Sequence, residues 1–292
     1  MFRGSLVALV TPFKRDGSVD RRRLLDLVDR QLAGGTDGIV PCGTTGEAAT
    51  LRPAERAAVV RLVSRHVRGR VPVIAGTGTN STAVTIDLSK DARRAGADAV
   101  LAVTPYYNKP TQAGLLAHYR HLAREVALPI VLYNVPSRTA VSLTPETVAR
   151  LSEVRGIVAI KEAGGIEQAG RILALCGIVV LSGDDAITLP MMAIGGKGVV
   201  SVVANLVPDR VQEMVSAAER GDWAIARALH HRLQPLIEAC FWESNPGPVK
   251  AMLARLGRIG PAMRLPLVPP MPETQKRLKR LLDRQGLTGY RG

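Results

Sequence analysis

Residues 156–162 read Gly-Ile-Val-Ala-Ile-Lys-Glu, a short apolar run that ends in a lysine and a glutamate. An apolar run of this length, preceded by glycine, predicts a short buried strand. Strands that are apolar on both faces are typical of a parallel sheet with helices on both sides. Similar runs recur along the chain, and together they predict eight strands: Leu6–Val10, Gly38–Pro41, Val71–Ala75, Ala99–Val103, Ile130–Tyr133, Ile157–Ile160, Ile178–Leu181 and Gly198–Val202.

Amphipathic stretches separate these strands, and several follow helix-capping residues such as Asp20, Ser81 and Thr144. Eight βα units predict an α/β fold, the closed (β/α)8 TIM barrel, for which about 250 residues are typical. A doubly wound open sheet is the alternative, but no Gly-x-Gly-x-x-Gly fingerprint opens the first unit. The clearest helices between strands are predicted at Arg22–Leu32, Pro53–Val67, Thr82–Ala95, Gly114–Val126 and Pro145–Leu151.

The strand pattern stops after Pro208, and the rest of the chain is predicted to be helical. We expect the barrel to occupy residues 1–207, with closing helices to about residue 222, and a helical extension to occupy residues 223–292. A Pro-rich stretch interrupts this part from Pro261 to Pro272. The helices predicted here are Val211–Arg220, Trp223–Cys240, Pro248–Leu256 and Glu273–Arg284.

The composition favours a globular protein with a large core over a membrane or secreted protein. The chain has 292 residues, 46% of them hydrophobic, which is enough for a large core. No run is long enough to span a bilayer, and the N-terminus shows no signal-peptide cleavage site. Cys42, Cys176 and Cys240 have no metal-ligand or redox spacing, so we expect buried thiols in the reducing cytoplasm and no metal site.

The net charge of +14 is high. Nucleic-acid binding is one explanation. Against it, the arginines are scattered over the predicted helices, and aromatic residues that could stack on bases make up only 3% of the chain. We therefore interpret the charge as a solvated basic surface that attracts anionic substrates.

Polar residues follow most of the predicted strands. Active sites of (β/α)8 barrels lie at the C-terminal ends of the strands, so these residues should share one rim. They are Gly43-Thr44-Thr45-Gly46-Glu47, Thr104-Pro105-Tyr106-Tyr107-Asn108, Tyr133-Asn134-Val135-Pro136-Ser137-Arg138, Lys161 and Gly183-Asp184-Asp185, with the eighth strand ending near Val200.

Lys161 is the most informative of these residues, because lysine is scarce in this chain and arginine carries most of its positive charge. A lysine can lose its proton and attack a carbonyl, whereas arginine stays charged. Burial in an apolar pocket lowers a lysine's pKa and frees the amine for imine formation. The alternative is a lysine whose stem lies on apolar surface while its ammonium reaches water.

The other rim residues fit the same chemistry. The Gly-Thr-Thr-Gly loop offers backbone N–H groups to a carboxylate, and it lacks the Lys-Ser/Thr ending of a phosphate loop. Tyr133 is a candidate general acid and base, with core packing as its alternative. Arg138 can hold a second carboxylate by two parallel hydrogen bonds, with a surface ion pair as its alternative. Asp184 and Asp185 are interpreted as cap or turn residues rather than metal ligands.

These motifs resemble those of the 4-hydroxy-tetrahydrodipicolinate synthase (dihydrodipicolinate synthase) family, in the pyruvate-dependent class I aldolase superfamily. The resemblance runs from Gly4-Ser-Leu-Val-Ala-Leu-Val-Thr-Pro-Phe13 to the helical tail. Its most specific segments are Gly43-Thr-Thr-Gly-Glu47, Val73-Ile-Ala-Gly-Thr-Gly78, Val103-Thr-Pro-Tyr-Tyr-Asn108, Tyr133-Asn-Val-Pro-Ser-Arg-Thr139, Ile160-Lys-Glu-Ala163 and Leu181-Ser-Gly-Asp-Asp185.

The resemblance implies a lyase that condenses pyruvate with L-aspartate-4-semialdehyde to 4-hydroxy-tetrahydrodipicolinate, in lysine and diaminopimelate biosynthesis, without an organic cofactor. Lys161 is then the lysine that forms the Schiff base with pyruvate, and Tyr133 is the proton donor and acceptor over the imine. Thr44 and Tyr107 complete the proton relay, and Tyr107 reaches in from a neighbouring subunit of a dimer or a homotetramer (a dimer of dimers).

By the same resemblance, Thr45 and the backbone at Val200 bind the pyruvate carboxylate, and Arg138 receives the carboxylate of the semialdehyde. A sister aldolase that acts on another 2-keto acid or a sugar acid would share the lysine and Tyr133, but not Arg138 and the Thr44–Tyr107 relay. A non-catalytic anion-binding or nucleic-acid-binding barrel is a third interpretation. No membrane or nucleic-acid partner is expected.

The resemblance also bears on regulation by lysine. In lysine-regulated members, the effector binds at the dimer interface, where an acidic residue is expected at the position of Val84 and imidazoles at the positions of Pro53 and Arg56. Lysine feedback is therefore predicted to be weak or absent. The corresponding positions in this chain are Ala48, Ala49, Pro53, Arg56, Asn80, Val84 and Tyr106.

Overall fold

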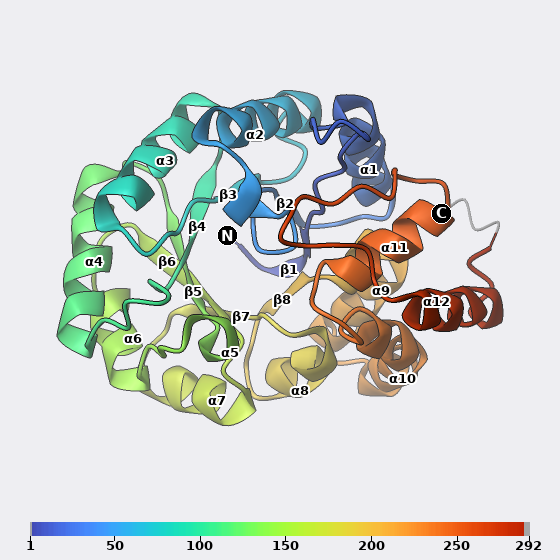
Figure 1. Cartoon of the computed structure of the whole chain (residues 1–292). Helices are drawn as coiled ribbons and strands as arrows, with labels where there is room; N and C mark the ends of the chain where they lie inside the picture. Colours follow the sequence, from blue (N-terminus) through green and yellow to red (C-terminus); the bar gives the residue numbers. More distant parts are fainter. Residues whose placement is uncertain (1, 289–292) are drawn as a thin grey trace.

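Eight parallel strands form the centre of the molecule in the computed structural model, which describes residues 2–288. Their order around the sheet is β2-β1-β8-β7-β6-β5-β4-β3, and a parallel bridge between Ile39 and Val73 brings the two ends together. Figure 1 looks along this barrel. The strands are β1 (Gly4–Ala8), β2 (Gly38–Val40), β3 (Ile74–Gly76), β4 (Ala99–Val103), β5 (Ile130–Asn134), β6 (Ile157–Glu162), β7 (Val179–Ser182) and β8 (Gly198–Ser201).

Helices surround the strands on the outside of the barrel (Figure 1). The predicted (β/α)8 TIM barrel is thereby confirmed. The helices of the barrel part are α1 (Arg21–Ala33), α2 (Pro53–Val67), α3 (Thr82–Arg94), α4 (Gln112–Glu125), α5 (Pro136–Thr139), α6 (Pro145–Ser152), α7 (Ile166–Leu175), α8 (Thr188–Ala193) and α9 (Pro208–Glu219), with 3-10 turns η1 (Ala48–Thr50), η2 (Asp185–Ile187) and η3 (Val203–Asn205).

The hydrophobic core has two layers, because successive side chains of a strand point to opposite faces. One layer fills the barrel, and in β5 it takes Val131 and Tyr133. The other lies between the strands and the helices, and it takes Ile130 and Leu132 from the same strand. In β6, Ala159 faces the interior and Ile160 faces the helices. The alternation along each strand therefore determines which side chains face the barrel interior.

All eight predicted strands are present, with ends displaced by at most a few residues. The expected caps are also confirmed, since the side chains of Asp20, Ser81 and Thr144 accept hydrogen bonds from backbone N–H groups in the first turns of α1, α3 and α6. Helices α7 and α8 were not among the clear predictions. α7 begins after Gly165 without a side-chain cap, and α8 has only six residues.

The C-terminal helices are α10 (Trp223–Ala239), α11 (Gly247–Arg255) and α12 (Pro272–Arg284). They lie together at one side of the barrel, as Figure 1 shows in orange and red. The part of the chain that follows α11 crosses the barrel mouth, because Pro266 and Leu267 line the cavity described below. The division into a barrel and an extension at residues 222–223 stays a prediction.

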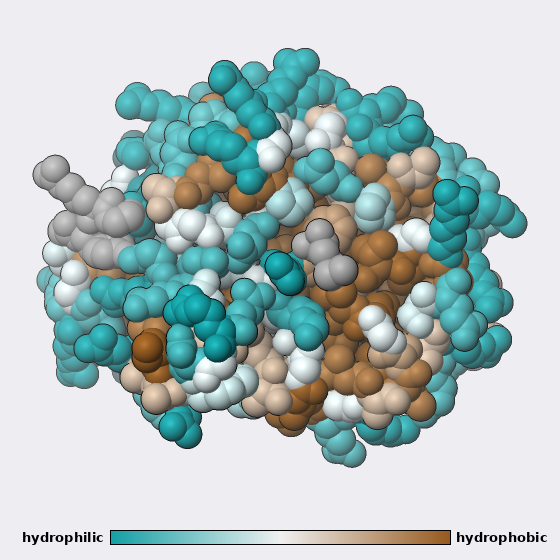
Figure 2. Space-filling model, turned by 180° about the vertical axis from the view of Figure 1, so that it is seen from behind, coloured by the Kyte–Doolittle hydropathy of each residue, from teal (hydrophilic) through white to brown (hydrophobic). Residues whose placement is uncertain are grey.

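The molecular surface is largely hydrophilic. Hydrophilic side chains cover most of the periphery, and apolar side chains gather in one region of the face seen from behind (Figure 2). Arg21, Arg22 and Arg23 are all exposed at the start of α1. No helix within residues 2–288 is long and apolar enough to cross a membrane. Cys42 and Cys240 are buried free thiols as expected, but Cys176 is only half-buried, because it caps the end of α7 near the surface.

Candidate active site

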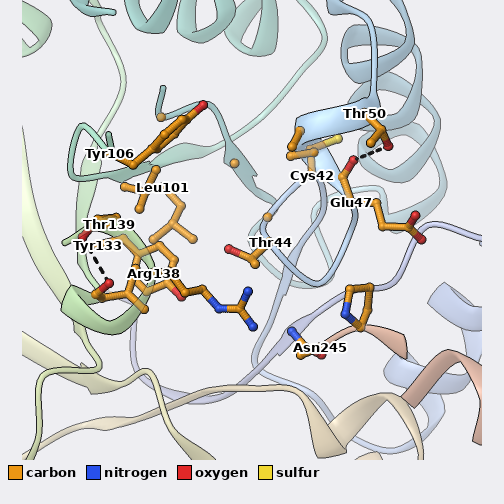
Figure 3. A pocket seen from close by; sticks show the side chains of 18 of the residues that line it. Cys42, Thr44, Glu47, Thr50, Leu101, Tyr106, Tyr133, Arg138, Thr139 and Asn245 are labelled. Atoms are coloured by element: carbon orange, nitrogen blue, oxygen red, sulfur yellow. Dashed lines mark hydrogen bonds between the residues drawn. The ribbon is translucent and has the colours of Figure 1, made fainter. Parts of the chain in front are cut away.

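A cavity of about 330 Å³ opens at the C-terminal ends of the strands. Thr44, Tyr133 and Arg138 line it, and all three were predicted to act together. Figure 3 shows the Arg138 side chain extending across the cavity, with its guanidinium between Thr44 and Asn245. Residues predicted for the rim after β2, β4 and β5 therefore line one cavity, whereas Lys161, Asp184 and Asp185 do not line it.

Lys161 is buried beside Tyr133, and Tyr133 lines this cavity. The lysine is 5% exposed, and its Nζ lies 4.3 Å from the centre of the Tyr133 ring. The two residues are opposite each other in the register of β5 and β6. Lys161 pairs with no carboxylate within residues 2–288. The alternative of a lysine with its ammonium in water is therefore wrong.

The loop after β2 offers backbone donors to an anion. The N–H groups of Gly46, Glu47 and Ala48 bond back to carbonyl groups within the loop. Those of Thr44 and Thr45 donate to no acceptor in the described part of the chain. Two adjacent N–H groups without an acceptor, the first on a residue that lines the cavity, are what a carboxylate nest requires.

Thr45 and Val200 do not line the cavity. Thr45 is 2% exposed, and its hydroxyl accepts a hydrogen bond from Asn245 Nδ2 at 3.0 Å. Val200 belongs to the apolar cluster that fills the barrel, together with Tyr133. Both residues lie beside the site. Their assignment to the pyruvate carboxylate stays a prediction.

Tyr107 is separated from the cavity of its own chain. It is 88% exposed and has a backbone φ of 73°, a conformation that is uncommon for a bulky residue. Tyr106 beside it does line the cavity. An exposed tyrosine held in this conformation next to a cavity is compatible with a role in a neighbouring subunit.

Arg138 is carried by the short helix α5, whose position is fixed by hydrogen bonds. Thr139 Oγ1 donates to the carbonyl oxygens of Val135 and Val141, at 3.1 and 2.9 Å. Thr104 Oγ1 from the end of β4 donates to Thr139 Oγ1 at 3.2 Å. Arg138 forms no ion pair within residues 2–288, so its guanidinium is available for an anionic ligand.

A buried ion pair joins the Gly43–Glu47 loop to the C-terminal helices. Glu47 and Lys250 form this pair, and their side chains are 0% and 1% exposed. Lys250 Nζ also donates to Thr11 O at 3.0 Å, and the backbone N–H of Arg264 donates to the second Glu47 oxygen at 3.2 Å. The pair was not predicted. The signal for it was a lysine inside the apolar helix pattern of residues 248–256.

Two further carboxyl groups are buried near the site. Burial raises the pKa of Glu162, the residue after Lys161, to about 7, although backbone and side-chain donors around it oppose the shift. Burial likewise raises the pKa of Asp185, which accepts hydrogen bonds from the backbone N–H groups of Val202 and Val203 after β8. Asp184 accepts from Ala186 N and begins a 3-10 turn, as its cap interpretation predicted. Residues 2–288 hold no cluster of three or more His, Cys, Asp or Glu that could bind a metal ion.

Five residues from the C-terminal part line the cavity and were not predicted from the sequence. This part is far along the chain from the strand ends that barrel architecture points to. Asn245 is the polar one with a visible role, because it holds Thr45. The five residues are Ser244, Asn245, Pro246, Pro266 and Leu267.

Known proteins show the same sequence and fold over nearly the whole chain. Residues 1–285 match the dihydrodipicolinate synthetase family. The 4-hydroxy-tetrahydrodipicolinate synthase of Syntrophus aciditrophicus is 51% identical over 99% of this chain and 100% of its own. That of Geobacter sulfurreducens is 57% identical over 92% of this chain and 93% of its own. The dihydrodipicolinate synthase of Acinetobacter baumannii, solved in complex with pyruvate, is 44% identical with a TM-score of 0.96, covering 98% of this chain and 99% of its own.

Proposed function

Because the chain belongs to the dihydrodipicolinate synthetase family, we propose that it condenses pyruvate with L-aspartate-4-semialdehyde to 4-hydroxy-tetrahydrodipicolinate. It is a lyase of the class I aldolase type and acts in lysine and diaminopimelate biosynthesis. The observation that carries the proposal is the position of Lys161, which is buried beside Tyr133, and Tyr133 lines the same cavity as Thr44 and Arg138. A soluble biosynthetic enzyme of this kind acts in the cytoplasm.

The first step forms an imine. The Lys161 amine attacks the keto carbon of pyruvate, and the carbinolamine loses water with proton transfers through Tyr133. The pyruvate carboxylate is bound by the free N–H groups of Thr44 and Thr45, with the backbone at Val200 on the other side. Loss of a methyl proton from the imine then gives an enamine.

The second step forms the new carbon–carbon bond. The enamine carbon attacks the aldehyde carbon of the semialdehyde, and Tyr133 supplies the proton that the aldehyde oxygen takes up. Arg138 holds the carboxylate of this substrate by two parallel hydrogen bonds, which fixes the aldehyde near the enamine. The amino group of the semialdehyde then displaces Lys161 from the imine carbon and closes the ring. One water molecule is released overall.

The proton relay extends to a second subunit in this proposal. Thr44 lines the cavity and Tyr107 lies outside it in the same chain. Tyr107 of a partner subunit completes the chain of hydroxyl groups through Thr44 to Tyr133. The active form is therefore a homo-oligomer, a dimer or a dimer of dimers.

A coupled assay with pyruvate and aspartate-4-semialdehyde, beside a panel of other aldehydes, tests the proposed reaction. The semialdehyde should be the best substrate by kcat/KM. Arg138→Ala should raise KM for the semialdehyde or lower kcat, and it should leave borohydride trapping of pyruvate largely intact. A preference for an aldehyde without a carboxylate, or an equal loss of both steps, would count against the assignment.

A further inference from the structure

A buried hydrogen-bond network lies behind the pair of Tyr133 and Lys161. In the register of β5 and β6, Asn134 and Glu162 form the next opposed pair. Because side chains alternate along a strand, these two project away from the barrel interior and toward the helices. Both are 0% exposed. A buried polar pair therefore occupies the outer face directly behind the cavity wall.

The Glu162 carboxylate accepts hydrogen bonds from several directions. Asn134 Nδ2 lies 3.0 Å from Oε1 and 3.1 Å from Oε2. The backbone N–H of Gly164 donates to Oε1 at 2.5 Å. All these partners are donors. They favour the ionised carboxylate, against the burial that raises its pKa, and none of them is an acceptor that an amide N–H at this position could use.

The same network closes the loop that carries Arg138. Asn134 begins this loop and Leu143 ends it, and Asn134 Oδ1 accepts from Leu143 N at 3.0 Å. Gln168 Nε2 donates to Leu143 O. An amide group has its donor and its acceptor on opposite sides. By taking the Nδ2 side of Asn134, Glu162 therefore directs the Oδ1 side to Leu143.

We propose that Glu162 is a positioning residue that holds the Arg138 loop, residues 134–143, against strand β6. It thereby sets the place of the second carboxylate site relative to Lys161. The inference rests on the proposed function, in which Arg138 binds the carboxylate of the semialdehyde. Glu162 touches neither substrate, and its effect passes through Asn134.

The test compares Glu162→Gln with Glu167→Gln. The first keeps the shape but removes the charge, and it places an amide donor where the donors of Asn134 and Gly164 point. The second makes the same chemical change at an exposed position of α7, and it is the matched control. Steady-state kinetics should show KM for the semialdehyde raised about tenfold in Glu162→Gln, the effect of losing one hydrogen bond to a charged group. Borohydride trapping of pyruvate should change by less than about twofold in both variants.

Hydrogen–deuterium exchange of residues 135–143 gives a readout that does not depend on the reaction. Exchange should be faster in Glu162→Gln than in the wild type and unchanged in Glu167→Gln. Gln168→Met is a milder second variant, which keeps the carboxylate but loses the bond to Leu143, and it should show the same direction of change in both measurements.

Three results would overturn the inference. One is unchanged exchange of the loop in a folded Glu162→Gln protein. Another is an unchanged KM for the semialdehyde. The third is an equal loss of pyruvate trapping and condensation, which would mean that Glu162 supports Lys161 itself. A wild type that traps pyruvate but does not condense it with the semialdehyde would contradict the proposed function instead, and the exchange measurement would still decide the role of Glu162.

Discussion

The buried pair of Glu47 and Lys250 should be a major contributor to stability and to the shape of the site. Removing Lys250 by substitution with Met leaves the Glu47 carboxylate buried, with the Arg264 N–H as its remaining donor. A buried charge that loses its partner typically costs about 3–5 kcal/mol. Because both side chains are at most 1% exposed, we expect Lys250→Met to fall in this range.

A double-mutant cycle separates the pair from the individual side chains. Glu47→Gln removes the charge but keeps an acceptor for Arg264, so the double variant Glu47→Gln/Lys250→Met no longer buries an unpaired charge. It should therefore be more stable than Lys250→Met alone. Urea unfolding, followed by circular dichroism at one protein concentration, gives the three free energies.

The same variants test the link to function, because Glu47 ends the loop that carries Thr44 and Thr45. Lys250→Met should raise KM for pyruvate, since the free N–H groups of this loop lose their fixed position. A cost below about 1 kcal/mol for Lys250→Met, or a double variant less stable than either single one, would refute the reasoning about an unpaired buried charge.

Three further predictions concern other parts of the molecule. Mixed dimers of Tyr107→Phe and Lys161→Ala subunits should regain activity that neither parent has, since one complete site forms; verified mixed dimers without such recovery would refute the shared site. L-Lysine titrated into the coupled assay at saturating substrate should inhibit weakly or not at all, because Val84 offers its ammonium no carboxylate; half-inhibition below the millimolar range would contradict this. Burial lowers the pKa of His118 to about 4, so the unfolded chain binds this proton first as the pH falls through about 6.5. The contribution of His118 to stability should therefore fall by about 2 kcal/mol between pH 7 and pH 5. The raised pKa of Glu162 acts in the opposite direction on total stability, so the measurement is the stability difference between the wild type and His118→Gln at the two pH values in urea unfolding.

Most of the barrel was predictable because the information is local. Each strand is a short apolar run, and each predicted cap is a Ser, Thr or Asp just before a helix. The ends of strands were harder to predict, because backbone hydrogen bonding rather than side-chain type determines where a strand begins and ends. β3 begins at Ile74 instead of Val71, since Pro72 lacks the N–H group that a strand interior uses.

The site likewise has a part that the sequence predicts and a part that it does not. Tyr133 and Lys161 lie near the C-terminal ends of strands, and Thr44 and Arg138 follow strands, so the architecture alone places all four on one rim. The contribution of the C-terminal part was not predictable, because it depends on contacts between distant residues. Asn245 and Thr45 are 200 positions apart. No local pattern encodes such a contact, and only the tertiary fold brings the two residues together.

The central claim is that Lys161 forms an imine with pyruvate, and borohydride trapping tests it most directly. The protein is incubated with pyruvate, reduced with borohydride, digested and mapped by mass spectrometry. The account predicts one adduct per chain, on Lys161, and no adduct in Lys161→Arg, whose guanidinium keeps its proton. An adduct on another lysine, including the buried Lys250, or no adduct in the wild type would contradict the account.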